Sequence, residues 1–295
     1  MSNVHFYLLF LSSISLFAQQ EPEVYLMDLH TAVDSFSVNN FKNISINKGY
    51  DSQPSFINDT QLVYAGTENG QTEIIRYDTN LETKGKVNKT TLGGEYSPQK
   101  FPSLERIAAV RLDPDGLQRL YGYDLNTNNS EESKELITDY KVAYFAFHDN
   151  NNIVASIIID DQLDLFKANL TSGEVVKITS NTGRSIHKVP GTDNVSYTAV
   201  NKDGIHEVYI INILGDNQSY YVCDLPIGIQ DHCWLTGTKL LLGSGDTLYV
   251  YDLFGNGKWE KVADLSSENI SEINRVTVSP DQKKLAIVAS PKIKQ

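Results

Sequence analysis

A repeat with a period of 42 to 46 residues constrains the fold of this chain more than any other feature. Its clearest copy, from Val276 to Ser290, reads VTVSPDQKKLAIVAS. Each copy has an apolar anchor residue, a polar turn, and a second apolar run that begins six or seven residues after the anchor. Self-similarity with this period indicates a solenoid or a propeller. The anchors are Phe56, Phe101, Phe147, Val189, Trp234 and Val278.

The residue types within the repeat predict β-strands. The units are rich in Val, Ile, Tyr and Thr, alternate with a period of two, and lack the 3.6-residue stripes of helical repeats. Short continuous apolar runs such as LVYAG, IVASIII and LAIVAS are typical of strands buried on both faces. Turns rich in Gly and Asp then lead to a third strand, such as TLYVYDL, and to a more polar fourth strand. Four strands per unit around a common axis form the blade of a β-propeller.

The two ends of the chain indicate how the ring closes. In five units the third strand ends near an Asp or Asn, and the sixth such residue would lie beyond Gln295. The segment EVYLMDL, Glu23 to Leu29, has the pattern of a third strand, and residues near Phe41 to Ile46 would supply the fourth. We therefore predict an all-β, six-bladed propeller of four-stranded blades, with the last blade closed by N-terminal strands, because pairing removes open strand edges.

Three segments, VSPDQKKLAIVAS, EVYLMDL and GYDSQPSF, resemble the TolB-type (WD40-like) propeller repeat. The usual form of that repeat is an aromatic-Ser-Pro-Asp-Gly turn, an apolar strand and a later Tyr-x-x-Asp. Ser279, Pro280 and Asp281 match the turn, and the resemblance spans residues 23 to 291. It implies a six-bladed propeller. The SLFAQQ ending of the first apolar run resembles that of exported proteins of Bacteroidetes-type bacteria.

The N-terminal segment predicts export. An apolar run from Phe6 to Phe17 is too short to span a bilayer and ends in small residues and Ala18. Residues 1–18 are therefore expected to be a cleaved signal peptide, and residues 19–295 a single propeller domain. A first buried strand is the alternative. No Cys follows the run, so we expect a periplasmic or secreted protein without a lipoprotein anchor.

The charge of the chain limits the classes of partner, and its two cysteines raise the question of a disulfide. The formal charge is -12 with no basic cluster, which disfavours nucleic acid and membrane-surface partners. We expect no membrane insertion after signal cleavage, and a monomer. The two cysteines, Cys223 and Cys233, either pair in an oxidising compartment or are two buried thiols; the predicted strand positions favour thiols.

Polar residues just before the anchors are the candidate binding residues, because the innermost strand of each blade lines the central channel. His187 and His232 both lie two residues before their anchors in neighbouring blades. Together with Asp231 they could hold a divalent metal. The alternative is a channel wall that is polar because it contacts water. The candidate channel-mouth residues are Asp51, Gln53, Tyr144, His187, Asp231, His232 and Arg275.

Catalytic sequence motifs are absent: the chain has no G-x-S-x-G, G-x-x-x-x-G-K-[ST] or H-E-x-x-H sequence. A rigid scaffold that binds an envelope protein, peptide or glycan, without a cofactor, is therefore the first functional hypothesis. The alternative is a metal-dependent propeller enzyme of the lactonase or lyase type, with one divalent metal in the channel.

Overall fold

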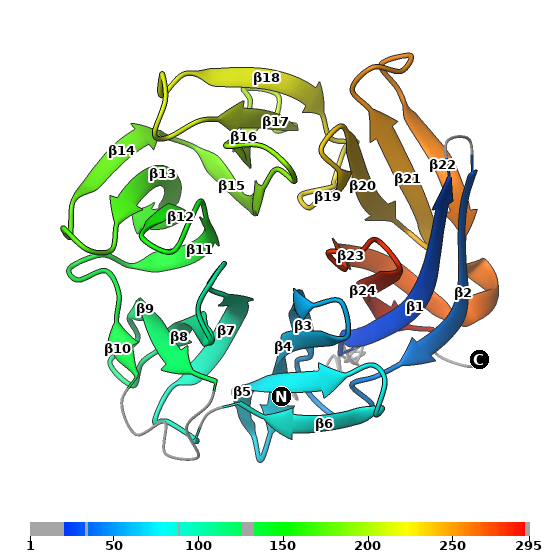
Figure 1. Cartoon of the computed structure of the whole chain (residues 1–295), viewed down its shortest axis with the longest axis horizontal. Helices are drawn as coiled ribbons and strands as arrows, with labels where there is room; N and C mark the ends of the chain where they lie inside the picture. The colour runs from blue at the N-terminus through cyan, green and yellow to red at the C-terminus, as the bar shows by residue number, and fades with distance from the viewer. Residues whose placement is uncertain (1–20, 33–34, 88, 126–132, 293–295) are drawn as a thin grey trace, which may run out of the picture.

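Six four-stranded antiparallel sheets stand around a central opening in the computed structural model (Figure 1). The structure describes residues 21–32, 35–87, 89–125 and 133–292. The predicted signal peptide, residues 1–18, lies outside these residues. The predicted fold class is confirmed: the chain is an all-β, six-bladed propeller.

Each blade runs from an inner strand beside the opening to an outer strand at the rim. Blade 1 comprises β3 (Ser52–Asn58), β4 (Gln61–Glu68), β5 (Gln71–Asp78) and β6 (Thr83–Lys86). Blade 2 comprises β7 (Gly94–Lys100), β8 (Arg106–Leu112), β9 (Gln118–Asp124) and β10 (Lys134–Glu135). Blade 3 comprises β11 (Val142–Phe147), β12 (Asn152–Ile159), β13 (Gln162–Asn169) and β14 (Val175–Thr179).

The remaining blades follow the same order. Blade 4 comprises β15 (Thr182–Lys188), β16 (Val195–Val200), β17 (His206–Ile211) and β18 (Ser219–Asp224). Blade 5 comprises β19 (Cys233–Thr236), β20 (Lys239–Ser244), β21 (Thr247–Asp252) and β22 (Trp259–Asp264). A 3-10 helix, η1 (Ser266–Glu268), leads to blade 6, which comprises β23 (Ile270–Val278), β24 (Lys284–Pro291), β1 (Glu23–Ala32) and β2 (Ser35–Asn43). Among the described residues, no helix has the length and apolarity needed to cross a bilayer.

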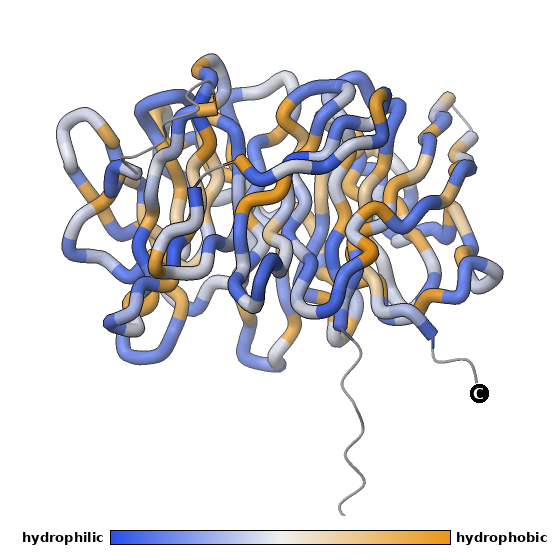
Figure 2. The backbone as a smooth tube through the Cα atoms, turned by 90° about the horizontal axis from the view of Figure 1, so that it is seen from below, coloured by the Kyte–Doolittle hydropathy of each residue, from blue (hydrophilic) through white to orange (hydrophobic). Residues whose placement is uncertain are grey.

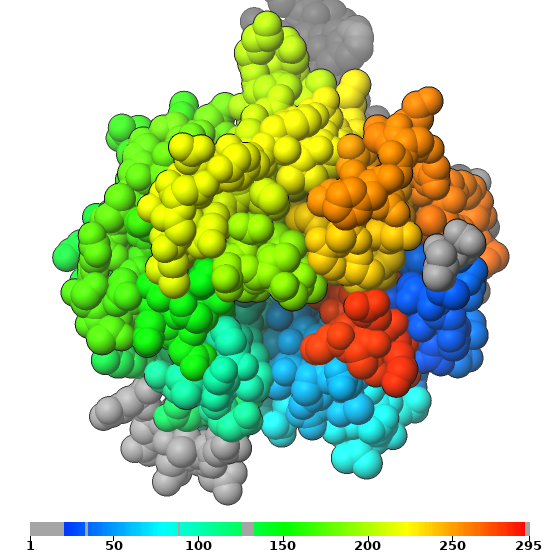
Figure 3. All heavy atoms as spheres, turned by 45° about the horizontal axis from the view of Figure 1, so that its top comes forward, coloured from blue at the N-terminus to red at the C-terminus, as the bar shows by residue number. Residues whose placement is uncertain are grey.

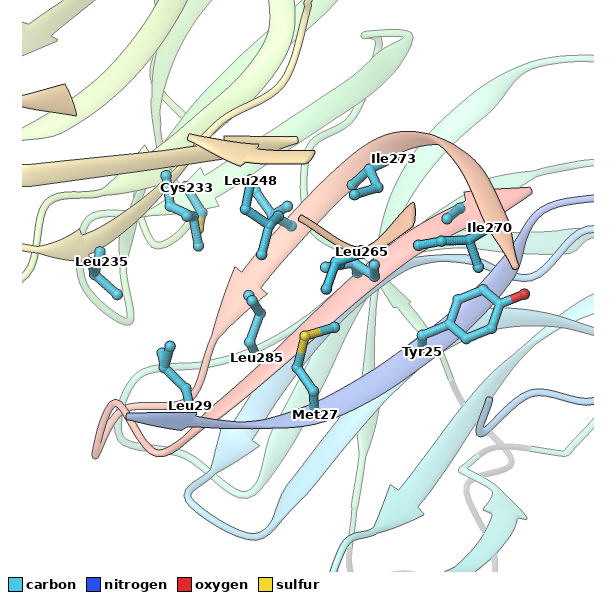
Figure 4. Packing of buried hydrophobic residues seen from close by; sticks show 14 residues of the cluster. Tyr25, Met27, Leu29, Cys233, Leu235, Leu248, Leu265, Ile270, Ile273 and Leu285 are labelled. Atoms are coloured by element: carbon cyan, nitrogen blue, oxygen red, sulfur yellow. The ribbon is translucent and has the colours of Figure 1, made fainter. Parts of the chain in front are cut away.

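The last blade is built from both ends of the described chain, as predicted. β1 pairs with β24 in the register from Glu23↔Ala289 to Asp28↔Lys284, and Lys284 Nζ lies 2.5 Å from Asp28 Oδ1. Figure 4 shows Met27 and Leu29 of β1 packing beside Leu285 of β24. The fourth strand differs from the expectation of Phe41 to Ile46: β2 covers Ser35–Asn43, because it pairs with β1 along its length, from Ala32↔Ser35 to Tyr25↔Asn43.

The apolar core lies between adjacent sheets. In Figure 2 the apolar segments lie within the strands, while the turns at both faces of the disc are mostly polar. Second strands carry much of this core: Leu62, Ile107, Ile153, Val195, Leu240 and Leu285, the residues that open the second apolar runs, are all fully buried. Figure 3 shows successive blades packed side by side around the ring. Close packing of this kind makes the inner strands a rigid frame for the channel.

Bulges interrupt the inner strands at similar places. The pairing of β3, β7, β11, β15 and β23 with their neighbours shifts register within the strand. Two residues there, Gln53 (φ 58°) and Ser97 (φ 50°), are non-glycine residues in the left-handed region, and each precedes a proline. A bulge re-aims the side chains around it. Strain of this kind persists only where the surrounding structure enforces it.

The two cysteines are separate free thiols. Cys223 and Cys233 are both buried, and they belong to different apolar clusters on opposite sides of the blade 5 sheet. The structure therefore agrees with the buried-thiol alternative and shows no bridge between them.

Candidate functional site: a basic cavity in the central channel

A cavity of about 470 Å³ occupies the channel, and all six blades contribute to its wall. This volume falls within the roughly 300–1,000 Å³ of typical ligand pockets. Four basic side chains line it against a single carboxylate, that of Asp231, although the whole chain has a formal charge of -12. The basic residues are Lys100, Arg184, Lys188 and Arg275. The cavity is thus a local concentration of positive charge in an acidic protein.

Six of the seven predicted binding residues line this cavity. The inner-strand bulges help to place them, because the predicted positions lie at or beside the register shifts. Asp231 and His232 precede β19 and reach the channel from a loop. The six residues that the structure brings together are Gln53, Tyr144, His187, Asp231, His232 and Arg275.

Asp51 is not part of the cavity wall. It lies just before β3, is 1% exposed, and accepts a hydrogen bond from Thr67 N at 3.2 Å. Burial first, and then repulsion from Glu23, raise the pKa of Asp51 to about 6. Glu95 of blade 2 has a similar position at the start of its inner strand, and burial raises its pKa to about 7. Both carboxyls are therefore buried groups that form hydrogen bonds within their own blades, outside the cavity wall.

A charged bridge crosses the channel between blades 4, 5 and 6. Asp231 accepts a hydrogen bond at Oδ2 from Arg184 Nε at 2.5 Å and at Oδ1 from Arg275 Nη1 at 3.2 Å. Arg184 also donates to the carbonyl oxygen of Asn274 at 3.3 Å. The guanidinium carbon of Arg275 lies 5.8 Å from the centre of the Tyr144 ring, within range of a cation-π contact. Two guanidinium groups thus share one carboxylate.

This bridge separates two hollows. A second cavity of about 370 Å³ lies toward the start of the inner strands of blades 5 and 6. Arg184, Asp231 and Arg275 line both cavities. Any change in this bridge would therefore alter both spaces.

The two histidines join a buried network of hydroxyl groups. Ser185 Oγ lies 3.0 Å from His187 Nε2 and 3.1 Å from His232 Nδ1. On its other side, His232 Nε2 lies 3.2 Å from Ser196 Oγ, which accepts a hydrogen bond from Trp234 Nε1 at 2.8 Å. Both ring nitrogens of His232 are therefore occupied by hydroxyl groups. The network fixes the two rings, which meet edge to face at 5.0 Å between centroids.

Both histidines are neutral at neutral pH. Burial lowers the pKa of His187 to about 4. Attraction by Asp231 opposes this shift, and repulsion from Arg275 adds to it. Burial, together with the neighbouring His187, lowers the pKa of His232 well below its usual value. The basic character of the cavity therefore comes from its Arg and Lys side chains.

The predicted metal ligands do not fit a metal. His232 uses both nitrogens on serine hydroxyls, and the Asp231 carboxylate is held by two cations that would repel a divalent ion. Among the described residues, no three His, Cys, Asp or Glu side chains are grouped so that they could hold a metal ion. The donor set suits an anion rather than a cation.

Reasoning from the sequence missed Arg184, which holds the bridge with Arg275. Arg184 lies five residues before its anchor Val189, whereas Arg275 lies three residues before Val278. Because β15 and β23 are bulged at different positions, residues at different distances from their anchors in the sequence reach the same cavity. The available signal was the presence of an arginine before the anchor in two of the six units.

Comparisons with known proteins show the fold alone. No protein-family model matches the chain, and no curated protein matches it. The solved structure of a putative TolB from Agrobacterium tumefaciens is similar with a TM-score of 0.69 at 11% identity, over 93% of this chain and 100% of that one. TolB from Acinetobacter baumannii gives 0.58 at 10% identity, over 92% of this chain and 65% of that one. An oligogalacturonate lyase in complex with manganese gives 0.50 at 12% identity, over 93% and 98%. The chain is thus a six-bladed β-propeller structurally similar to the TolB propeller.

Proposed function

We propose that this protein is an exported binding scaffold that holds part of an envelope protein, peptide or glycan in its channel cavity. The observation that carries the proposal is the convergence of all six inner strands on one cavity of about 470 Å³ with an excess of basic side chains. Binding residues on a rigid scaffold are the common use of such a frame. The predicted signal peptide at residues 1–18 supports a periplasmic or secreted site in a Bacteroidetes-type bacterium.

A plugged cavity tests the proposal. Thr277 on β23 lines the cavity, so Thr277→Trp should fill it, whereas Thr83→Trp on the exposed outer strand β6 should leave it open. Wild-type protein and the Thr83→Trp control should recover the same partner from an envelope extract, and Thr277→Trp should not. Equal recovery by all three proteins would place binding outside the channel.

The alternative that the sequence left open, a metal-dependent enzyme, is not favoured by the cavity and can be tested separately. It requires a bound divalent ion, which the hydrogen-bonded His232 and the arginine-paired Asp231 do not favour. Elemental analysis of protein purified without chelator gives a direct answer. A stoichiometric divalent metal would support the enzyme and contradict the scaffold without a cofactor.

A further inference from the structure

We infer that the channel cavity recognises a carboxylate of an acidic peptide segment. This carboxylate competes with the side chain of Asp231 for Arg184 and Arg275. The inference rests on the proposed function, because it names the chemistry of the ligand at the same cavity. Its basis is the placement of Arg184 and Arg275 on either side of a single carboxylate.

The geometry around Asp231 is already that of a carboxylate site. Each of its two oxygens accepts from a different guanidinium group, and its side chain is 9% exposed. Arg guanidinium groups match planar carboxylates in this way and keep their charge at any ordinary pH. With two arginines and one aspartate, the bridge retains one unneutralised positive charge. An incoming carboxylate would find a preorganised partner there.

Additional cations surround the bridge. Lys188 lines the cavity, and its side chain forms no hydrogen bond or ion pair with another described residue. Burial lowers the pKa of Lys188, and attraction by Asp193 and Asp149 opposes this shift. Lys100 Nζ lies 3.4 Å from Glu105 Oε1. The Glu105 side chain is 63% exposed, so this ion pair is weak and leaves Lys100 able to attract an anion in the cavity. An anion in the cavity would thus meet several positive groups in surroundings that water screens only partly.

The wall favours a peptide over a sugar. Stacking on a sugar ring needs an aromatic face open to the ligand. Of the aromatic side chains in the wall, Phe145, Phe147 and Trp234 are buried. The Tyr144 ring faces Arg275, and the partly buried Phe56 packs against the apolar cluster between blades 6 and 1. Four proline rings contribute to the apolar part of the wall, beside core side chains such as Ile186 and Val276. Peptides with acidic residues are the usual targets of arginine clusters in such settings. The prolines are Pro54, Pro98, Pro102 and Pro190.

The decisive experiment uses a hexapeptide with an amidated C-terminus, an internal Asp-Glu pair and an uncharged fluorescent label, compares it with its Asn-Gln counterpart, and measures affinity by fluorescence polarisation. The acidic peptide should bind and the amide peptide should not, with affinity falling as salt increases. Asp231→Asn should strengthen binding about tenfold, because it removes the internal competitor; tenfold corresponds to about 1.4 kcal/mol. Arg275→Gln should weaken binding at least tenfold.

Control variants separate recognition from folding. Arg76→Gln, on the exposed face of β5, should bind like wild type. Arg275→Gln leaves Arg184 and Asp231 as a pair without net charge, whereas the double variant Asp231→Asn/Arg275→Gln leaves Arg184 without its carboxylate partner. The double variant should therefore bind the acidic peptide more tightly than Arg275→Gln alone. Thermal melting of each variant shows whether it is folded.

Three results would overturn the inference: weaker binding by Asp231→Asn in a folded protein, equal binding of the acidic and amide peptides, or binding of an oligouronate or inorganic phosphate in place of the peptide. These results differ from failure of the proposed function. If Thr277→Trp abolishes partner capture while the acidic peptide does not bind, the scaffold stands and the carboxylate chemistry is wrong.

Discussion

The closure of the ring by β1 gives a quantitative prediction for Met27→Ala. Met27 is 1% exposed and packs in the apolar cluster between blades 5 and 6. Truncation of a buried Met to Ala typically costs about 2–5 kcal/mol, through lost transfer free energy and the cavity left behind. Since whole domains have unfolding free energies of about 5–15 kcal/mol, this single change should remove a large part of the stability.

Urea unfolding followed by tryptophan fluorescence measures this effect. The only two tryptophans, Trp234 and Trp259, both lie in blade 5, so they report on a blade other than the one that is mutated. If the ring unfolds as one unit, Met27→Ala should lower the urea midpoint without changing the slope. Leu81→Ala, at a side chain that is 73% exposed, is the matched control and should change stability by no more than about 0.5 kcal/mol.

Deletion of residues 21–32 extends the test. It removes β1 and with it five buried apolar side chains, each worth about 1.5–3 kcal/mol when fully buried. The loss is comparable to the whole stability of a domain, so the shortened chain should show no cooperative transition. A shortened chain with the wild-type midpoint, or a Met27→Ala shift as small as that of Leu81→Ala, would refute the closure argument. The deleted apolar residues are Val24, Tyr25, Leu26, Met27 and Leu29.

Three further predictions concern buried titratable groups. Burial raises the pKa of Glu95 to about 7, so the folded state binds this proton more tightly than the unfolded state, and stability falls as pH rises from about 4.5 to 7. Glu95→Gln should therefore raise the unfolding free energy at pH 8 by about 3 kcal/mol and change it little at pH 4.5. The pKa of His187 is lowered to about 4, so its contribution is lost as pH falls from 6.5 toward 4, and His187→Gln should flatten the stability profile in that window; an unchanged profile would contradict the neutral buried state. Burial raises the pKa of the Cys223 and Cys233 thiols, so both should react with a thiol reagent only after unfolding, and rapid labelling of the native protein would argue against their buried placement.

The architecture was predictable because its signals are local and repeated. A polar turn followed by a buried run marks each inner hairpin, and the pattern of Glu23 to Leu29 was enough to assign β1 to the blade that β23 and β24 begin. The start of β2 was missed, although Phe36 and Val38 alternate with polar residues and pack against the apolar cluster of blades 5 and 6, because the alternating segment is short and mostly exposed.

The site was predictable in part. Counting back from the anchors placed His187 and Arg275 correctly, because their strands bring them to the same cavity. The same count failed for Asp51, which lies before the bulge of β3, and it missed Arg184, whose offset from Val189 differs from that of Arg275. Bulges change which side chain faces the channel without leaving a consistent mark in the sequence. The partners of the Asp231 carboxylate come from blades 4 and 6, and such long-range pairs can be seen only in space.

The bridge around Asp231 also breaks the sixfold likeness of the blades. Blades 4, 5 and 6 supply its charges. Blades 1 and 2 face the cavity with the amides of Gln53, which accepts a hydrogen bond from Ser97 N, and Gln99, which donates to the carbonyl oxygen of Phe145, and with Lys100 as the one charged side chain that they add. Charge is therefore distributed unevenly across the width of the channel. A guest with one charged end would be turned as it entered, with that end toward blades 4 to 6, so a ring of near-equal parts can still hold an asymmetric molecule in one orientation.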